Sequence, residues 1–454
     1  MHEVADAIDP EPPYKVGVPH GTFSDQMGGP REVSPRTRLL RNRAFALLFS
    51  AQLVSLLGSG ATTIGLALFA YRLAGATEAT AIVGNALMLR IVAFLLFSQP
   101  AGVFADRWPR RRILIASDVL RAALLGVLPL ASAVWHVYVT VFVLNALTAF
   151  FTPTFEATIP SVVAEEDLVT ALGLSRIATD VEALASPVLA AAIITFVGVD
   201  AVFWFDGATY LASALLVACV ALPTRHEDAK PPLSIGGFLG ELGAGTRIVL
   251  REPSLRQAIL MSLAEATAGA GAIVVTVALV RNVLARGETT VSLVMAAVGV
   301  GSSLTALALA RVTGRYERSV EPSALHGARH VWGRRALLAG GVCMTLALLP
   351  VWLKPPVAVV AALWALLGAG QALVAIPGST LLAEHTTDEE RGRAYAAHFA
   401  LTHACWLATY PALGHAAARW GATPTLTIAG AACLGVTMLA SLTRAGDPKH
   451  SHVH

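Results

Sequence analysis

The sequence predicts an all-α membrane protein in which twelve helices cross the bilayer in two sets of six. Of its 454 residues, 55% are hydrophobic and only 14% are charged, whereas soluble domains carry about 25% charged residues. Apolar runs of about 20 residues recur along the chain, and a helix needs this length to cross the hydrocarbon. One long polar stretch, residues 223–252, divides the runs into two equal sets.

The predicted spans follow from the individual apolar runs. The first set is Ala44–Tyr71, Ala79–Ala101, Ile113–Trp135, Val137–Ile159, Leu168–Val197 and Ala201–Leu222. The second set is Ala258–Val280, Thr290–Ala310, Ala336–Leu353, Val357–Leu382, Ala394–Ala417 and Thr423–Leu442. The predicted parts of the chain are a disordered Pro-rich arm (1–40), two helical halves (41–222 and 256–443), a linker (223–255) and a histidine-containing tail (444–454).

The positions of the basic residues predict how the chain is oriented. With the N-terminus inside, the outer turns hold only Arg72, Arg281, Arg286, Lys354 and Arg419, out of 33 Lys and Arg residues. Cytoplasmic loops of membrane proteins are enriched in Lys and Arg. We therefore expect a multi-pass protein of the cytoplasmic membrane with both termini in the cytoplasm. The N-terminal arm contains no apolar run, so we expect no signal peptide.

A short basic loop joins the second and third predicted spans. Its characteristic residues are Gly102, Asp106, Arg107, Arg110 and Arg111. The spacing resembles the signature loop of the major facilitator superfamily, with Pro109 where that family usually has a second glycine. The resemblance implies two six-helix bundles, transport by alternating access and a gating role for this loop. The alternative is a basic loop that only orients two helices.

A second, interrupted copy of this pattern follows the eighth predicted span. It reads Gly314-Arg315-Tyr316-Glu317-Arg318, then an insertion, then Gly333-Arg334-Arg335. Such an echo supports a duplication in which the two halves are parallel repeats about an axis along the membrane normal.

The fifth predicted span carries the most informative polar residues. Residues Ser175, Thr179, Glu182 and Ser186 share one helix face. Asp180 lies four residues after Arg176, so those two side chains can pair locally, whereas Glu182 has no such neighbour. A carboxylate inside the bilayer normally faces a cavity or a partner. We expect Glu182 to face a transport cavity, with a structural ion pair to another helix as the alternative.

Further polar groups lie in other spans. The candidate proton and substrate site comprises Glu182, Asp180, Glu265, Arg90, Gln52, His398, His403 and Cys405. Arg90 is the natural counter-ion for Glu182 or Asp180. The serines and threonines of the spans have a simpler explanation, because small and hydroxyl side chains allow membrane helices to pack closely.

Histidines suggest a metal at two places. His398 and Cys405 share a face of the eleventh span, and His403 lies about 140° around the helix from His398. Imidazole and thiolate ligands suit borderline transition metals, although histidines that bond to neighbouring backbone groups remain the alternative. In the tail, His450, His452 and His454 alternate and could form a weak chelator; a random polar tail is the competing interpretation.

Four stretches narrow the resemblance: 151–160, 171–182, 265–271 and 403–411. They are similar to the twelve-span drug:proton antiporter branch, and look closest to bacterial nickel/cobalt-resistance exporters. This resemblance implies a proton-coupled exporter of nickel or cobalt. The alternatives are a proton-coupled exporter of drugs, antibiotics or a siderophore, with cavity aromatics such as Trp364 or Phe69, and, more remotely, a non-transporting membrane receptor.

Several classes are excluded by the sequence. It contains none of the nucleophile-elbow, zinc-protease or phosphate-loop motifs, so we expect neither an enzyme nor an ATP-driven pump. The net charge of +3 is too small to indicate a nucleic-acid partner. We expect a monomer that needs no cofactor, and whose partners are a small ion or molecule, protons and the lipid bilayer.

The signature loop yields a first prediction. Replacing Asp106 by Asn removes a charge with almost no change of shape, so we expect transport of every substrate to be lost while membrane insertion stays normal. Uptake and efflux assays on membranes with matched protein levels measure this. A variant that kept its flux but changed its substrate profile would show that the loop selects substrates and does not gate.

Overall fold

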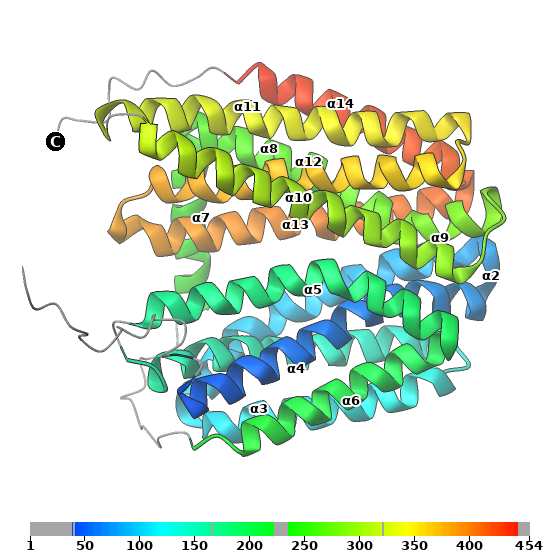
Figure 1. Cartoon of the computed structure of the whole chain (residues 1–454), viewed down its shortest axis with the longest axis horizontal. Coiled ribbons are helices and arrows are strands. Elements are labelled where there is room, and N and C mark those ends of the chain that lie inside the picture. The colour runs from blue at the N-terminus through cyan, green and yellow to red at the C-terminus, as the bar shows by residue number, and fades with distance from the viewer. Residues whose placement is uncertain (1–38, 40, 165–166, 222–234, 320–321, 444–454) are drawn as a thin grey trace, which may run out of the picture.

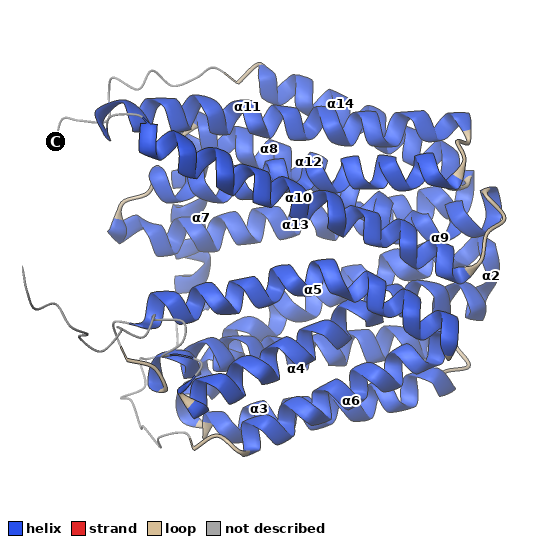
Figure 2. Cartoon of the chain, in the orientation of Figure 1, coloured by secondary structure: helices blue, strands red, loops and turns tan. Residues whose placement is uncertain are grey.

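The computed structural model describes residues 39, 41–164, 167–221, 235–319 and 322–443. Every regular element in this part of the chain is helical, as Figure 2 shows. The prediction of an all-α membrane protein is therefore confirmed.

The helices of the first half are α2 (Arg43–Arg107), α3 (Arg110–Val127), α4 (Val134–Thr158), α5 (Leu168–Phe196) and α6 (Val199–Ala218). Those that follow are α7 (Ile235–Arg251), α8 (Pro253–Ala270), α9 (Thr276–Ala278), α10 (Glu288–Ser319), α11 (Pro322–Leu348), α12 (Val357–Glu384), α13 (Asp388–Trp420) and α14 (Ala422–Ser441). Two π-helical turns, Gly271–Val275 and Leu279–Val283, flank α9 and extend α8 across the molecule.

Helix α2 contains the first two predicted spans. They are joined at Gly75, whose φ of 76° and ψ of −178° interrupt the helix. A side chain is strained at such a positive φ, whereas glycine adopts it readily. The chain therefore turns back at this residue, and the two segments of α2 run as separate membrane helices.

Ten helices in the described part of the chain are long and apolar enough to cross a membrane. They coincide with ten of the twelve predicted spans. The two remaining predicted spans correspond to α5 and α13, which are 29 and 33 residues long. At 1.5 Å per residue both can cross the bilayer, and both carry polar residues that the sequence singled out.

The helices form two halves, which Figure 1 shows one above the other. In the first half α2 packs on α4, α5 and α6, and α3 packs on α4 and α6; in the second half α12 packs on α10 and α11, and α14 on α8 and α11. The halves meet where α2 contacts α13 and where α5 contacts α10. Helix α7 lies against α13 at one end of the molecule. We call this the linker end and the opposite end, which contains the Gly75 turn, the hairpin end.

Hydrogen bonds join the two halves near the hairpin end. They are Tyr71 Oη to Asn282 Oδ1 (2.5 Å), Thr80 Oγ1 to the Gly414 carbonyl (3.0 Å) and the Thr195–Thr289 hydroxyl pair (2.7 Å). Each bond joins a residue of the first half to one of the second. The three bonds lie between three different pairs of helical segments. The halves are therefore held together at this end.

Two glycines allow the closest approach of α2 and α13. A Cβ atom added at Gly84 would lie less than 3.0 Å from the Tyr410 carbonyl oxygen, and one added at Gly414 would lie less than 3.0 Å from that of Thr80. Both obstacles are backbone atoms, which cannot rotate away. Small residues serve the same purpose in membrane helix interfaces generally.

We expect Gly84→Ala to weaken closure of the hairpin end. Forcing an extra methyl group into a packed interface costs about 1–3 kcal/mol, enough to change the ratio of two conformations by about fivefold or more. Spin labels at Glu78 and Arg419, both exposed in this conformation, measure the separation of α2 and α13 in a cysteine-free background. The distances should shift to longer values.

Gly126→Ala is the matched control, since a Cβ there meets nothing within 4 Å. It should leave the distance distribution as in the unsubstituted protein. An unchanged distribution in Gly84→Ala would contradict the proposed role of this contact.

Candidate functional site

A cavity of about 600 Å³ lies between the two halves. The first half contributes Gly60, Thr63, Ile64, Arg90, Ile91, Phe94, Asn145, Thr148, Thr152, Glu182, Ser186 and Pro187, and the second half contributes Ile273, Met295, Phe399, His403, Trp406 and Tyr410. This volume is typical of sites for small organic molecules. We call it the central cavity.

Aromatic side chains form one side of the central cavity. The rings of Phe94 and Phe399 lie 6.0 Å apart, those of Trp406 and Tyr410 5.2 Å apart, and His403 stacks on Phe399 at 3.7 Å. Phe399 is 40% exposed. Such rings bind apolar groups through their area and cations through their faces.

Glu182 reaches the central cavity because α2 has no side chain opposite it. A Cβ atom at Gly60 would lie less than 3.0 Å from Glu182 Oε1 and from Ser186 Oγ. Ser186 donates to the Leu57 carbonyl at 3.1 Å, which ties α5 to α2 one turn further on. The predicted polar face of the fifth span thus lies against α2, with Glu182 at the cavity wall.

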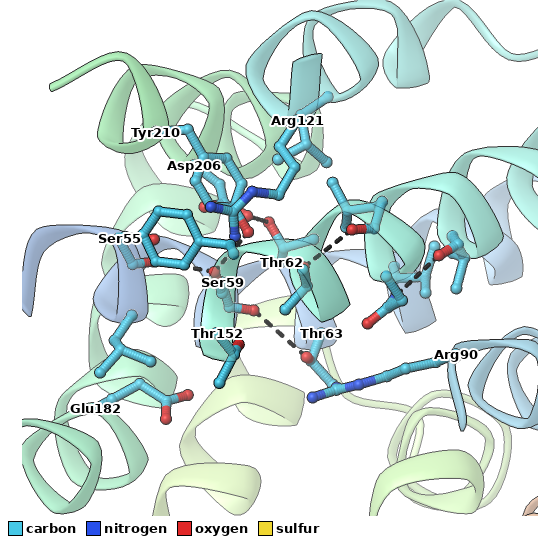
Figure 3. Close-up of a pocket in the computed structure, with 18 of the residues that line it drawn as sticks. Ser55, Ser59, Thr62, Thr63, Arg90, Arg121, Thr152, Glu182, Asp206 and Tyr210 are labelled. Carbon is cyan, nitrogen blue, oxygen red and sulfur yellow. Dashed lines mark hydrogen bonds between the residues drawn. The ribbon is translucent and has the colours of Figure 1, made fainter. Parts of the chain in front are cut away.

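A second cavity, of about 350 Å³, lies inside the first half. Figure 3 shows its polar lining. Many of the lining residues are hydroxyl or amide side chains: Gln52, Ser55, Ser59, Thr62, Thr63, Thr140, Asn145, Thr148, Thr152 and Thr179. Glu182 and Arg90 are among the residues that line both cavities, so the two cavities adjoin at these residues. We call this the inner cavity.

A buried charged cluster lies at the far end of the inner cavity from Glu182. Asp118 and Arg121 form an ion pair on α3, and Arg121 and Tyr210 line the cavity together with Asp206. The guanidinium of Arg121 lies 4.4 Å from the ring centre of Phe151 and 4.2 Å from that of Tyr210.

This cluster was not among the predicted site residues, although the sequence contained a signal for it. Asp118, Arg121 and Asp206 all fall inside predicted spans, and an ionisable residue in a span is costly unless it has a partner or a cavity. The same rule singled out Glu182. The spacing of Asp118 and Arg121, three residues apart, would also have predicted their local pairing.

Arg90 does not pair directly with Glu182. Among the described residues no ion pair within 4 Å joins them, although their charges interact across the cavity wall. Arg90 is exposed at the cavity surface. The side chain of the other proposed partner, Asp180, lies outside the described part. A cationic and an anionic group therefore face the same space without neutralising each other through contact.

Two further predicted site residues, Gln52 and Glu265, lie in different parts of the structure. Gln52 lines the inner cavity, and its side-chain oxygen is buried without a hydrogen-bond partner. Glu265 lies in the second half near Cys405, outside the lining of either cavity. Gln52 therefore shares the inner cavity with Glu182, whereas Glu265 lies away from both cavities.

The predicted metal ligands do not come together. His403 donates a hydrogen bond from Nδ1 to the Phe399 carbonyl (2.8 Å) and lines the central cavity, whereas His398 and Cys405 do not line it. In the part of the chain that the structure describes, no group of three His, Cys, Asp or Glu residues could hold a metal ion. The tail residues His450, His452 and His454 lie outside that part.

The basic residues of the signature loop bind helix ends within their own half. Arg110 donates to the Ala157 carbonyl at the end of α4 (2.6 Å), and Arg111 donates to the Ala218 carbonyl at the end of α6. Basic groups stabilise these electronegative ends. The side chains of Gly102, Asp106 and Arg107 lie outside the described set, so their gating role stays a prediction.

The second half repeats one of these contacts. Arg334, which belongs to the degenerate echo of the loop, donates to the Thr443 carbonyl just after α14 (2.7 Å). Helices α11 and α14 occupy in the second half the chain positions that α3 and α6 occupy in the first. The repeated contact fits the duplication that the sequence predicted.

Two aromatic residues were wrongly assigned to the cavity. Trp364 is fully buried and donates to Thr276 Oγ1 at 2.9 Å, and Phe69 packs edge-on against Phe203 at 5.6 Å. Sequence alone does not say which face of a uniformly apolar helix meets a cavity.

Two helical halves that meet at a polar and aromatic cavity in the middle of a membrane protein define a transporter scaffold. The chain belongs to the Major Facilitator Superfamily, whose family profile matches residues 48–328 and 268–454. The resemblance that the signature loop indicated is thus confirmed. Members of this family are transporters and not enzymes, which also agrees with the sequence.

Two relatives of this chain are macrolide efflux proteins. Macrolide efflux protein A of Streptococcus pyogenes is 27% identical over 225 residues, covering 48% of this chain and 54% of that protein. Macrolide efflux protein A of Enterococcus faecalis is 28% identical over 190 residues, covering 40% and 57%. The match spans only about half the length of these relatives. They are not metal exporters, so they do not support the narrower resemblance to nickel/cobalt exporters.

A solved structure confirms the fold. That of a nucleoside transporter superposes with a TM-score of 0.68 and 14% identity, covering 87% of this chain and 99% of the other. At this identity the likeness concerns the arrangement of the helices alone.

Proposed function

We propose that the protein is a secondary active exporter of amphipathic organic compounds, of the macrolide type or similar, in the cytoplasmic membrane. One observation carries this proposal: the central cavity combines a carboxylate, Glu182, with the aromatic wall of Phe94, Phe399, Trp406 and Tyr410. An amphipathic amine fits both features, because its cation can approach the carboxylate while its apolar body covers the rings. The macrolide efflux relatives support this substrate class.

We assign the linker end to the cytoplasm. The positive-inside rule supports this orientation, since the hairpin-end turns carry few of the basic residues. In that orientation the hydrogen bonds between the halves close the outer side. The conformation described here is therefore one in which a substrate would load from the cytoplasm.

Export would require a conformational change that closes the end now open to substrate and opens the other. The contact of α2 with α13 and that of α5 with α10 near the hairpin end would open while the linker end closes. The two halves would move as rigid bodies around the central cavity, as expected for a transporter built from repeats.

We assign the coupling proton first to Glu182. Loss of water from a carboxyl group favours its neutral form, and an approaching cation favours its charged form. A cationic substrate and a proton would therefore compete for the same group. This competition would exchange an entering proton for a leaving substrate.

Export of nickel or cobalt is a weaker candidate. Divalent transition metals need several His, Cys or carboxylate ligands that converge, and the described residues contain no such group. A metal function would thus need ligands from outside the described residues, such as the tail histidines.

A tolerance panel tests the proposal. Expression in a sensitive bacterial strain should raise tolerance to macrolides and other amphipathic amines while leaving nickel and cobalt tolerance unchanged. Minimum inhibitory concentrations, with cell-associated drug and metal measured in parallel, give the result. Higher metal tolerance with unchanged drug tolerance would reverse the assignment, and absence of flux in proteoliposomes for every compound would favour a receptor.

Glu182→Gln should abolish export driven by a pH gradient, because the amide keeps the size and hydrogen bonding of the carboxyl but cannot cycle a proton. Exchange of substrate down its own gradient should survive. Proteoliposomes with and without an imposed pH gradient measure both rates for each variant.

Two controls accompany this variant. Ser186→Ala, one turn away, should cost much less, and Glu288→Gln makes the same chemical change at the start of α10, outside both cavities. If Glu182→Gln exports at the rate of the unsubstituted protein under a pH gradient, Glu182 is structural, and Asp180 or Glu265 becomes the candidate.

A further inference from the structure

The carboxylate of Asp206 is completely buried and is held by hydroxyl groups alone. Thr62 donates to its Oδ2 at 2.6 Å, and the Thr209 hydroxyl, which donates to the Asp206 backbone carbonyl at 2.7 Å, also lies 3.2 Å from Oδ1. Within the described residues no basic group lies within 4 Å of it. An ionised carboxylate in a membrane interior is costly without a counter-charge, so this geometry calls for a proton or a movable cation.

A movable cation lies nearby. Arg121 is paired with Asp118 in this conformation, and its guanidinium lies between the rings of Phe151 and Tyr210. The hydroxyl of Tyr210 is in turn hydrogen-bonded to Ser59 at 2.8 Å. Asp206, Asp118, Arg121 and Tyr210, from α3 and α6, are the titratable groups that lie together here, and Glu156 of α4 and Glu182 of α5 line the same cavity.

One short segment of α2 contacts both carboxylates of the first half. A Cβ atom at Gly58 would lie less than 3.0 Å from Asp206 Oδ1, and one at Gly60 would lie less than 3.0 Å from Glu182 Oε1. Ser59 lies between them. A shift of this segment would therefore change the surroundings of both carboxyl groups. The inner cavity also provides a polar path between them.

We propose that Asp206 is a second proton-binding site, separate from Glu182, and that Arg121 is its charge switch. In the state described here Asp206 carries the proton as a neutral carboxyl, and Arg121 neutralises Asp118. When the O–H bond of Asp206 breaks, its proton passes to water in the inner cavity. The carboxylate left behind attracts Arg121 from Asp118, which changes how α3 packs on α6.

A proton fits this site better than a sodium ion. A fixed metal cation needs several converging oxygen ligands, whereas the described side-chain contacts of the Asp206 carboxyl are the hydroxyls of Thr62 and Thr209. A proton merely neutralises the carboxyl. The two threonine hydroxyls can keep their hydrogen bonds to a neutral carboxyl, which needs no further ligands.

The first test needs no substrate. Infrared difference spectra of the full-length protein in detergent, recorded during a pH titration, should show the C=O band of a protonated carboxyl that is missing in Asp206→Asn. Asp200→Asn is the matched control, because Asp200 is a partly exposed carboxylate that pairs with Arg72 at the hairpin end. This control should keep the band. A band unchanged by Asp206→Asn would overturn the proposal.

Thr62→Val is the alternative variant for the infrared measurement if Asp206→Asn does not fold. Valine has nearly the shape of threonine, and it removes the 2.6 Å hydrogen bond to Asp206 while leaving the carboxyl in place. The C=O band should move to higher frequency, because the group loses a donor. A band that stays at its original frequency in this variant would mean that it belongs to another carboxyl.

The second test concerns coupling and rests on the proposed export function. In proteoliposomes, Asp206→Asn should lower the number of protons that enter per substrate exported, while substrate exchange without a gradient persists. A wild-type proton count in this variant contradicts the coupling role. Dependence on sodium, with loss of the infrared band when sodium is added, would show a sodium site and overturn the proton assignment.

The two tests distinguish failure of the export proposal from failure of the second proton site. If the unsubstituted protein moves no amphipathic compound yet shows the Asp206 band, the export proposal is wrong and the protonation site stands. If the protein exports while the band and proton count of Asp206→Asn match those of the unsubstituted protein, the second proton site is wrong and the export proposal stands.

Discussion

The cost of placing a charge inside the membrane organises the first half of this protein. Three arrangements there offset that cost: Asp118 and Arg121 pair with each other, Asp206 accepts hydrogen bonds from two threonines, and Glu182 opens onto a cavity. Groups inside the bilayer that lack such arrangements are rarely retained. The helices that carry these groups are accordingly the ones packed around the inner cavity.

Glycines in α2 make room for both carboxylates. At Gly58 and Gly60 the backbone of α2 directly faces Asp206 and Glu182, where any side chain would collide with an oxygen atom. Ser59, between them, bonds to Tyr210. The three-residue segment is thus both a packing contact and the physical link between the two acidic sites. A change at either carboxylate would be transmitted through backbone atoms, which cannot relax by rotating a side chain.

Most of the fold could be predicted from the sequence because bilayer thickness fixes the length of a span. Apolar run length located the helices, and the polar face of the fifth span identified Glu182 before its cavity was known. Contacts between helices could not be predicted from the sequence. Periodicity shows which residues share a face but not which helix that face meets, so Trp364 was wrongly placed in the cavity and the direct pairing of Arg90 with Glu182 is absent. Asp206 was missed despite a usable signal.

The two halves have diverged in chemistry while keeping a common architecture. The first half supplies Glu182 and Arg90 to the central cavity, and holds the buried Asp206 cluster behind them, whereas the second half contributes Phe399, His403, Trp406 and Tyr410. The two carboxyl groups that we propose as proton sites, Glu182 and Asp206, thus both lie in the first half, whereas three of the four aromatic residues of the cavity wall lie in the second. Because the halves touch across the cavity, a substrate that lies on the aromatic wall also approaches Glu182. Recognition by one half and coupling by the other can therefore meet at a single bound molecule.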